Sequence, residues 1–86
     1  MLKLSDTVSI KQDETNYFFF DNETGDIYKL NEISYKILSL CDGRTTSEDI
    51  LLTITSEFNV TEQEAKKDFD ALIKKLLSKK YIYNNE

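Results

Sequence analysis

Few residues of this chain have the types and spacing that enzymatic chemistry needs. The one cysteine, Cys41, would be the natural nucleophile, but the chain contains no histidine to activate it. The absence of histidine also removes the commonest metal ligand, and no run of Asp and Glu has the spacing of a calcium-binding loop. The only glycines, Gly25 and Gly43, cannot form a phosphate-binding loop. The residues therefore predict a protein without catalytic activity, metal or cofactor, in which Cys41 is a small buried side chain.

The charges of the chain argue against nucleic acid as a partner. The formal net charge is −5. Residues 1–60 contain eleven acidic and five basic side chains, whereas residues 61–86 contain five acidic side chains and six lysines. An acidic surface repels phosphates, and the late lysines are interleaved with Asp and Glu, as on a solvated helix.

Length and hydrophobicity bound the class of protein. A chain of 86 residues fits one domain with a modest core, and 40% hydrophobic residues are typical of a folded domain. The longest apolar runs are too short to cross a bilayer, and polar residues follow Met1 too soon for a signal peptide. We expect a cytoplasmic protein, residues 1–86 forming a single domain.

The elements that must position any site begin with three strands. Residues 7–12 alternate between apolar and polar, 17–21 form an aromatic run, and 26–31 alternate again. The segments between them, 13–16 and 22–25, have turn composition. Two successive hairpins predict a three-stranded antiparallel sheet. Alternation in the aromatic run puts Tyr17 and Phe19 on one face and Phe18 and Phe20 on the other.

Helical patterns follow the strands. Asn31 is a good N-cap for a first helix, and Gly43 is suited to the position just after its end. Thr45 or Thr46 caps a second helix. The apolar side chains expected to be buried by these two helices are Ile33, Ile37, Leu38, Leu40, Cys41, Ile50, Leu51, Ile54 and Phe58.

The third helix has the clearest start signal in the chain. Thr61 and Glu64 form a capping box, and the helical pattern runs to about Lys79. Its broad apolar face comprises Ala65, Phe69, Leu72, Ile73, Leu76 and Leu77, and of these Phe69, Ile73, Leu76 and Leu77 are expected in the core. Residues 81–83 fit a small strand or an extended tail.

This order predicts an α+β fold, in which a three-stranded antiparallel β-sheet is followed by three α-helices. The second and third helices are arranged like a winged helix-turn-helix.

The chain resembles a known family, the PqqD-like proteins, also called precursor peptide recognition elements of ribosomally made peptide pathways. The resemblance covers residues 5–83. The residues that carry it are Tyr28, Leu30, Asn31, Ile37, Leu38, Asp42, Gly43, Thr45, Phe58, Val60, Asp68, Leu72, Ile73 and Leu76. One departure is that the family often has glycine before the final apolar pair, where this chain has Lys79 and Lys80.

The resemblance implies a non-catalytic module that binds the leader segment of a precursor peptide and presents it to a modifying enzyme or leader protease. The leader would add as a strand beside the third strand and lie against the third helix. The peptide-binding residues that it implies are Asp26, Ile27, Lys29, Leu30, Asp68, Leu72 and Lys75. Lys75 or Lys79 would suit an acidic leader, and Asp68 a basic one.

Several alternatives remain open at the level of sequence. Tyr28 could form part of the peptide floor, but core packing against the first helix is the favoured interpretation. Four successive aromatic residues leave one face partly exposed, which suits a partner enzyme or a second copy of the chain. The pathway could be of the lasso-peptide or the radical-enzyme type, and the oligomeric state is not predicted.

Two other functions compete with peptide recognition. One is a small DNA-binding winged-helix regulator, against which stands a recognition helix without arginine. The other is a docking domain of a larger enzyme, although Met1 and the polar residues 84–86 fit a free-standing chain.

Overall fold

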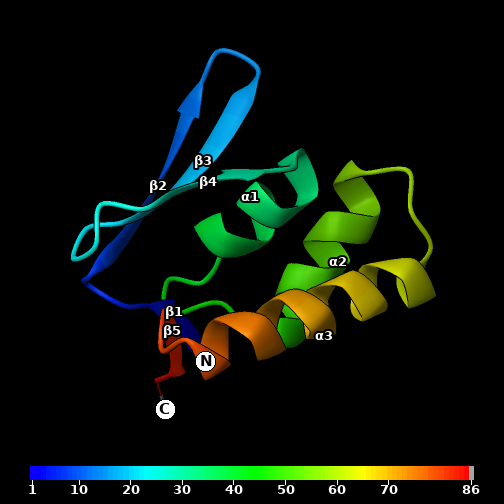
Figure 1. Ribbon diagram of the computed structural model, residues 1–86. Helices are drawn as coiled ribbons and strands as arrows, with labels where there is room; N and C mark the ends of the chain where they lie inside the picture. Colours follow the sequence, from blue (N-terminus) through cyan, green and yellow to red (C-terminus); the bar gives the residue numbers. More distant parts are fainter. Residues whose placement is uncertain (86) are drawn as a thin grey trace.

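The computed structural model describes residues 1–85 and contains two small sheets and three helices (Figure 1). The elements in chain order are β1 (Leu2–Leu4), β2 (Val8–Asp13), β3 (Asn16–Asp21), β4 (Ile27–Leu30), α1 (Glu32–Ser39), α2 (Ser47–Glu57), α3 (Glu62–Ser78) and β5 (Ile82–Asn84).

The predicted antiparallel sheet is confirmed, with strand order β2-β3-β4. Ile10 lies opposite Phe19 in one ladder, and Phe19 lies opposite Tyr28 in the other. The turn of the β2–β3 hairpin projects away from the helices (Figure 1). The strand order makes β4 one edge of this sheet, the edge at which the family resemblance implies strand addition.

A second, two-stranded sheet joins the two ends of the chain. β1 pairs antiparallel with β5, with Leu4 opposite Ile82. The Met1 ammonium group donates to Asn84 Oδ1 over 2.8 Å. A strand at 81–83 is one of the two conformations that the sequence predicts there, whereas the strand at Leu2–Leu4 is not predicted. Three residues are too few for a clear alternation, and their partner strand lies at the other end of the chain.

The helix starts follow the predicted caps. The side chains of Asn31, Thr46 and Thr61 accept hydrogen bonds from the first turns of α1, α2 and α3 over 2.7, 3.1 and 3.1 Å. Since Thr46 caps α2, the choice between Thr45 and Thr46 is settled. The Thr61 hydroxyl also hydrogen-bonds the Glu64 carboxylate at 3.1 Å, so the capping-box pair is confirmed.

The predicted end of the first helix is wrong. α1 ends at Ser39 with Leu40 as its C-cap, so Gly43 does not terminate it. Gly43 has a φ of +79° in the following turn, and its N–H donates to the Leu2 carbonyl over 2.9 Å. The glycine therefore serves the approach of β1, a contact that local sequence does not reveal.

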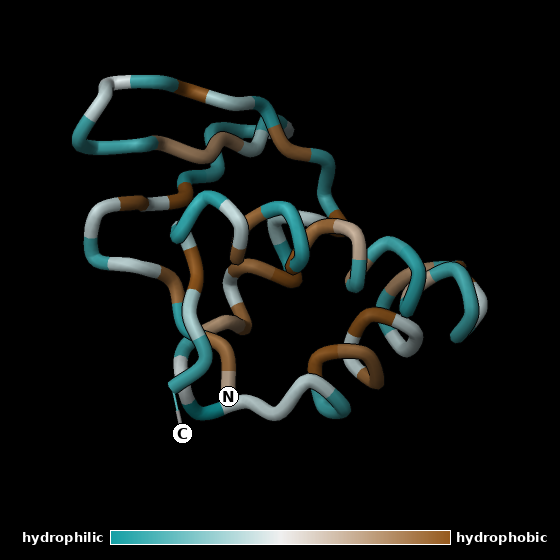
Figure 2. Tube along the Cα trace, turned by 60° about the horizontal axis from the view of Figure 1, so that its bottom comes forward, coloured by the Kyte–Doolittle hydropathy of each residue, from teal (hydrophilic) through white to brown (hydrophobic). Residues whose placement is uncertain are grey.

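The helices and the sheet enclose one hydrophobic core. Hydrophobic and hydrophilic stretches alternate turn by turn along the helices (Figure 2). The buried side chains of the hydrophobic core are Leu2, Val8, Phe19, Ile37, Leu38, Cys41, Ile50, Ile54, Ala65, Phe69, Ile73, Leu76 and Ile82. Leu77 was expected in this core but is 44% exposed, because the buried stripe of α3 runs through Phe69, Ile73 and Leu76.

The turn after α3 adopts a conformation that favours glycine. Lys79 is the C-cap of α3, and Lys80 has a φ of +61°. The Lys80 N–H donates to the Leu77 carbonyl over 3.1 Å. The departure from the family pattern therefore leaves the turn in place, with a lysine in the left-handed region at some cost in strain. No helix within residues 1–85 is long and apolar enough to cross a membrane.

Candidate functional site: a groove between an edge strand and a helix

A groove of about 250 Å³ separates β4 from the C-terminal half of α3. We call it the β4–α3 groove. Its lining residues are Phe19, Tyr28, Lys29, Leu30, Leu38, Leu72, Lys75, Leu76, Lys79 and Tyr81. Buried Phe19, Leu38 and Leu76 supply an apolar floor, and the charged residues stand at the rim. The groove thus offers an apolar site of limited size beside an edge strand.

The floor is assembled by aromatic contacts between three elements. The Phe19 ring on β3 lies 6.2 Å from the Tyr28 ring on β4 and 5.1 Å from the Tyr81 ring, centroid to centroid, both tilted by 54°. Tilted packing at these distances is favourable for aromatic pairs. These contacts hold the strands against the segment that follows α3, so the groove is shaped without a ligand.

The open edge of β4 exposes the backbone of alternate residues. The Asp21 N–H donates to the Asp26 carbonyl over 2.9 Å, which makes these opposed residues a hydrogen-bonded pair. Because such pairs alternate along an antiparallel ladder, Tyr28 and Leu30 also direct their backbone groups to β3. Ile27 and Lys29, the residues between them, direct N–H and C=O to the open edge. These groups are available to another strand.

A buried carboxylate is hydrogen-bonded to a residue of the groove lining. Asp21 is 6% exposed and accepts the Tyr81 hydroxyl over 2.8 Å, as well as the N–H groups of Glu23 and Thr24 over 3.0 and 3.2 Å. The bond from Tyr81 is the main reason why the pKa of Asp21 is lowered, and the same bond raises the pKa of Tyr81 to about 12. The pair fixes the end of α3 to the turn before β4.

The structure brings four of the seven predicted peptide-binding residues to the groove. Lys29, Leu30, Leu72 and Lys75 all line it. Ile27 is 60% exposed beside it, with its side chain on the opposite face of the sheet.

The other two predicted residues lie apart from the lining. Asp68 is exposed on α3, one turn before Leu72, and is not a lining residue. Asp26 belongs to the turn before β4, where its carboxylate accepts the Thr24 hydroxyl over 3.0 Å.

Tyr28 corrects the favoured interpretation of a core residue packed against the first helix. Tyr28 is 43% exposed and lines the groove, because α1 packs against β2 and β3 and leaves the inner face of β4 open. The strand alternation already puts Tyr28 on the same face as Leu30, which was a usable signal. The floor residues Leu38 and Tyr81 were missed, since nothing local links them to β4.

The opposite face of the sheet has a partly exposed apolar patch. Phe18 and Phe20, half-buried, have ring centroids 6.3 Å apart, and Ile27 lies opposite Phe20. The predicted division of the aromatic run between two faces agrees with the strand register. Ile27 links this surface to the free edge of β4.

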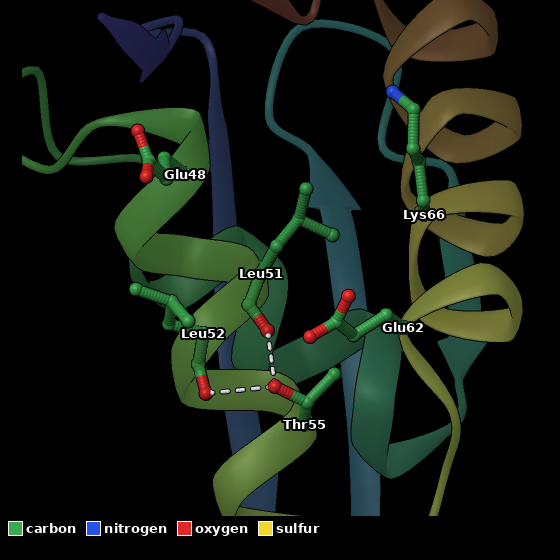
Figure 3. A pocket seen from close by; sticks show the side chains of 6 residues that line it. All are labelled: Glu48, Leu51, Leu52, Thr55, Glu62 and Lys66. Carbon is green, nitrogen blue, oxygen red and sulfur yellow. Dashed lines mark hydrogen bonds between the residues drawn. The ribbon is translucent and has the colours of Figure 1, made fainter.

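A second hollow, of about 290 Å³, lies between α2 and α3 (Figure 3). We call it the α2–α3 hollow. Glu48, Leu51, Leu52 and Thr55 line it from α2, and Glu62 and Lys66 line it from α3. The Thr55 hydroxyl lies 3.1 Å from the carbonyl oxygens of both Leu51 and Leu52, its own helix (Figure 3). Helix backbone surrounds this hollow, so it offers a ligand no free strand edge.

The cysteine of the chain lies outside both sites. Cys41 is 3% exposed, and burial raises the pKa of its thiol to about 12, so the thiol stays protonated at neutral pH. Its Sγ lies 3.3 Å from the Ile37 carbonyl oxygen. Within residues 1–85, no group of three or more Cys, Asp or Glu is arranged to hold a metal ion. The arrangement of the groove is suited to binding.

Comparison with known proteins gives one family and two solved structures. The model of the family described as "Coenzyme PQQ synthesis protein D (PqqD)" matches residues 17–82. A structure described as TbiB1 in complex with the TbiA(beta) leader peptide has a TM-score of 0.78 at 22% identity, covering 93% of both chains. A lasso peptide synthetase B1 complexed with the leader peptide has a TM-score of 0.79 at 22% identity, covering 95% of this chain and 96% of the other. No curated protein matches the chain significantly. The predicted α+β fold is thereby confirmed.

Proposed function

This chain belongs to the PqqD family, and on that premise we propose that it binds the leader segment of a ribosomally synthesised precursor peptide in the β4–α3 groove. The observation that carries the proposal is the free edge of β4 beside the apolar floor. A guest strand there would bond to the backbone of Ile27 and Lys29 and place alternate side chains over Phe19 and Leu76.

The preformed groove supports a role in recognition. The contacts of Phe19, Tyr28 and Tyr81 define the floor before any peptide arrives. Binding therefore has to order only the peptide and not the groove, which reduces its entropic cost. Both similar structures are described as complexes with leader peptides, which favours a peptide as the ligand of this fold.

The proposed role is non-catalytic, and the chemistry falls to a partner. A modifying enzyme or leader protease would act on the peptide while this chain holds its leader. The likeness to a lasso peptide synthetase B1 favours a lasso-peptide type of pathway. The apolar outer face with Phe18, Phe20 and Ile27 adjoins the bound strand and is our candidate surface for that partner. In this proposal residues 1–86 form a single recognition domain.

A titration of the purified protein with fluorescently labelled leader peptides tests the proposal. The peptides come from short reading frames beside its gene, and a labelled random DNA duplex serves as the control ligand. We expect saturable binding of one peptide that an unlabelled copy displaces. Binding of the duplex alone, with a strong dependence on salt, would instead identify a winged-helix DNA-binding protein.

A further inference from the structure

We propose that the leader held in the β4–α3 groove is acidic, and that Lys75 and Lys79 select for its carboxylates, with Lys29 on the outer face of the edge strand as an additional contact. This inference rests on the proposed function and specifies the chemistry of its ligand. It chooses between the acidic and the basic leader that the sequence left open.

The charges at the groove contrast with those of the whole chain. The chain has a net charge of −5, yet every charged residue that lines the groove is a lysine. Asp68, which would suit a basic leader, is not a lining residue. Asp21 lies beside the lining residue Tyr81, but its carboxylate already accepts three hydrogen bonds, one of them from that residue. The groove thus presents positive charge with an apolar floor between.

The three lysines have no partner within the part of the chain that the structure describes. The ion pairs there are Lys36 with Glu57 at 3.4 Å and Lys66 with Asp70 at 3.3 Å, both away from the groove. Lys75 and Lys79 stand four residues apart on one helix, where like charges destabilise each other. A bound carboxylate would relieve that repulsion, so an acidic ligand is favoured over a neutral one.

Stabilisation of α3 alone does not explain the positions of the lysines that line the groove. Lysines in the last turn of a helix interact favourably with its dipole, and Lys75 lies in the last turn of α3, directly after Lys74. Lys74, however, does not line the groove, and Lys29 comes from a strand, where that effect is absent. Lys75 and Lys79 from α3 lie beside the apolar floor, and Lys29 stands at the edge of β4 with its side chain on the other face of the sheet.

The geometry gives the ligand a pattern. Side chains of a strand added to β4 alternate, so those facing the groove stand two residues apart. One bulky apolar side chain would enter the floor, and an acidic residue two positions away would face Lys75 and Lys79. A second acidic residue, opposite Lys29 on the other face, would form a cross-strand pair.

Charge-reversal variants test the inference with a matched control. The bound peptide from the titration above is measured against wild type, Lys75→Glu, Lys79→Glu and Lys74→Glu. We expect Lys75→Glu and Lys79→Glu to weaken binding about 3- to 10-fold each. Lys74→Glu makes the same change to the helix outside the groove and should stay within about twofold of wild type. Circular dichroism and thermal unfolding establish that all variants are folded.

Changes of peptide and salt separate the inference from the proposed function. A peptide with its acidic residues replaced by Gln should bind more weakly than the natural peptide. In 0.5 M NaCl the difference in affinity between the two peptides should become smaller, since salt screens exposed charges. A peptide that binds equally to Lys74→Glu, Lys75→Glu and Lys79→Glu overturns the charge inference and leaves peptide recognition standing. If no peptide binds, both the proposed peptide recognition and the preference for an acidic leader are wrong.

Discussion

The β4–α3 groove and the α2–α3 hollow lie along the same helix and have similar volumes, about 250 and 290 Å³, but only one is built for a strand. The groove has the free edge of β4 as a wall and lysines at its rim. The hollow is walled by two helices and carries Glu48 and Glu62 with Lys66. Volume and apolar lining are therefore shared by both sites, and the unpaired backbone groups beside an apolar floor are what the proposed strand addition requires of the groove.

The charge difference between the two sites follows the direction of α3. Glu62 and Glu64 lie in its first turn, and Lys75 lies in its last. That order matches the helix dipole, which favours acidic residues at the start and basic ones at the end. A stabilising feature of one helix thus also gives its two ends opposite preferences for a ligand.

The largest expected effect on peptide affinity comes from a carboxylate placed in the groove, and the same change in the hollow is its control. Leu72→Glu puts a carboxylate on the wall of the groove and should weaken binding of the leader peptide at least about 10-fold, because the peptide would cover an unpaired charge where it now contacts apolar surface. Leu52→Glu, in the hollow, should leave the affinity unchanged, since Leu52 is 56% exposed there. Fluorescence anisotropy measures both. Equal losses in the two variants would mean that the hollow also binds the peptide.

A smaller effect should come from one backbone group of the free edge. Ile27→Pro removes an N–H that faces away from β3, so the sheet should tolerate it at the first residue of an edge strand. Compared with Ile27→Ala, which keeps the N–H, it should weaken peptide binding roughly 2- to 12-fold, the value of one hydrogen bond. Identical affinities of the two variants would exclude strand addition at this residue.

The smallest expected effect on binding concerns the hydrogen bond between Asp21 and Tyr81, a residue that lines the groove and not the hollow. Tyr81→Phe removes the hydroxyl bond to Asp21 and should lower the melting temperature, while the ring contact with Phe19 and most of the affinity remain. Because the pKa of Asp21 is lowered in the folded state, its contribution is present above its unfolded pKa and lost as pH falls through the folded value.

The Tyr81 side of this pair has the opposite dependence on pH. Its pKa is raised to about 12, so its contribution is present below the unfolded value of about 10 and lost as pH rises through about 12. Thermal unfolding of wild type and Tyr81→Phe across this range measures both limbs. A difference between the two proteins that does not change with pH would show that ionisation of Asp21 and Tyr81 is not linked to the stability that the Tyr81 hydroxyl provides.

Local signals in the sequence predicted most elements but not how they meet. The capping residues Asn31 and Thr61 marked helix starts, and alternation marked the strands, because these features depend on neighbours in the chain. Leu77 was misplaced since the core covers only one stripe of α3, and Gly43 was misread because its function is to let β1 approach. Both errors concern contacts between distant segments.

The site was predictable to the same extent. The family pattern pointed to β4 and α3, and Lys29, Leu30, Leu72 and Lys75 do line one groove. The floor could not be predicted, because Leu38, Tyr81 and Phe19 converge only after folding. Tyr28 was misassigned for a similar reason, as its exposure depends on where α1 packs.

The pairing of β1 with β5 has a consequence for the order of folding. Leu2 and Ile82 both belong to the core, yet nearly the whole chain separates them. During synthesis β1 emerges before the other elements described here and remains unpaired until β5 leaves the ribosome. Closing so long a loop costs entropy that only the finished core repays, so this step should come late and slowly. The β2–β3–β4 meander, with its local contacts, can form earlier, so the edge strand should exist before the molecule is complete.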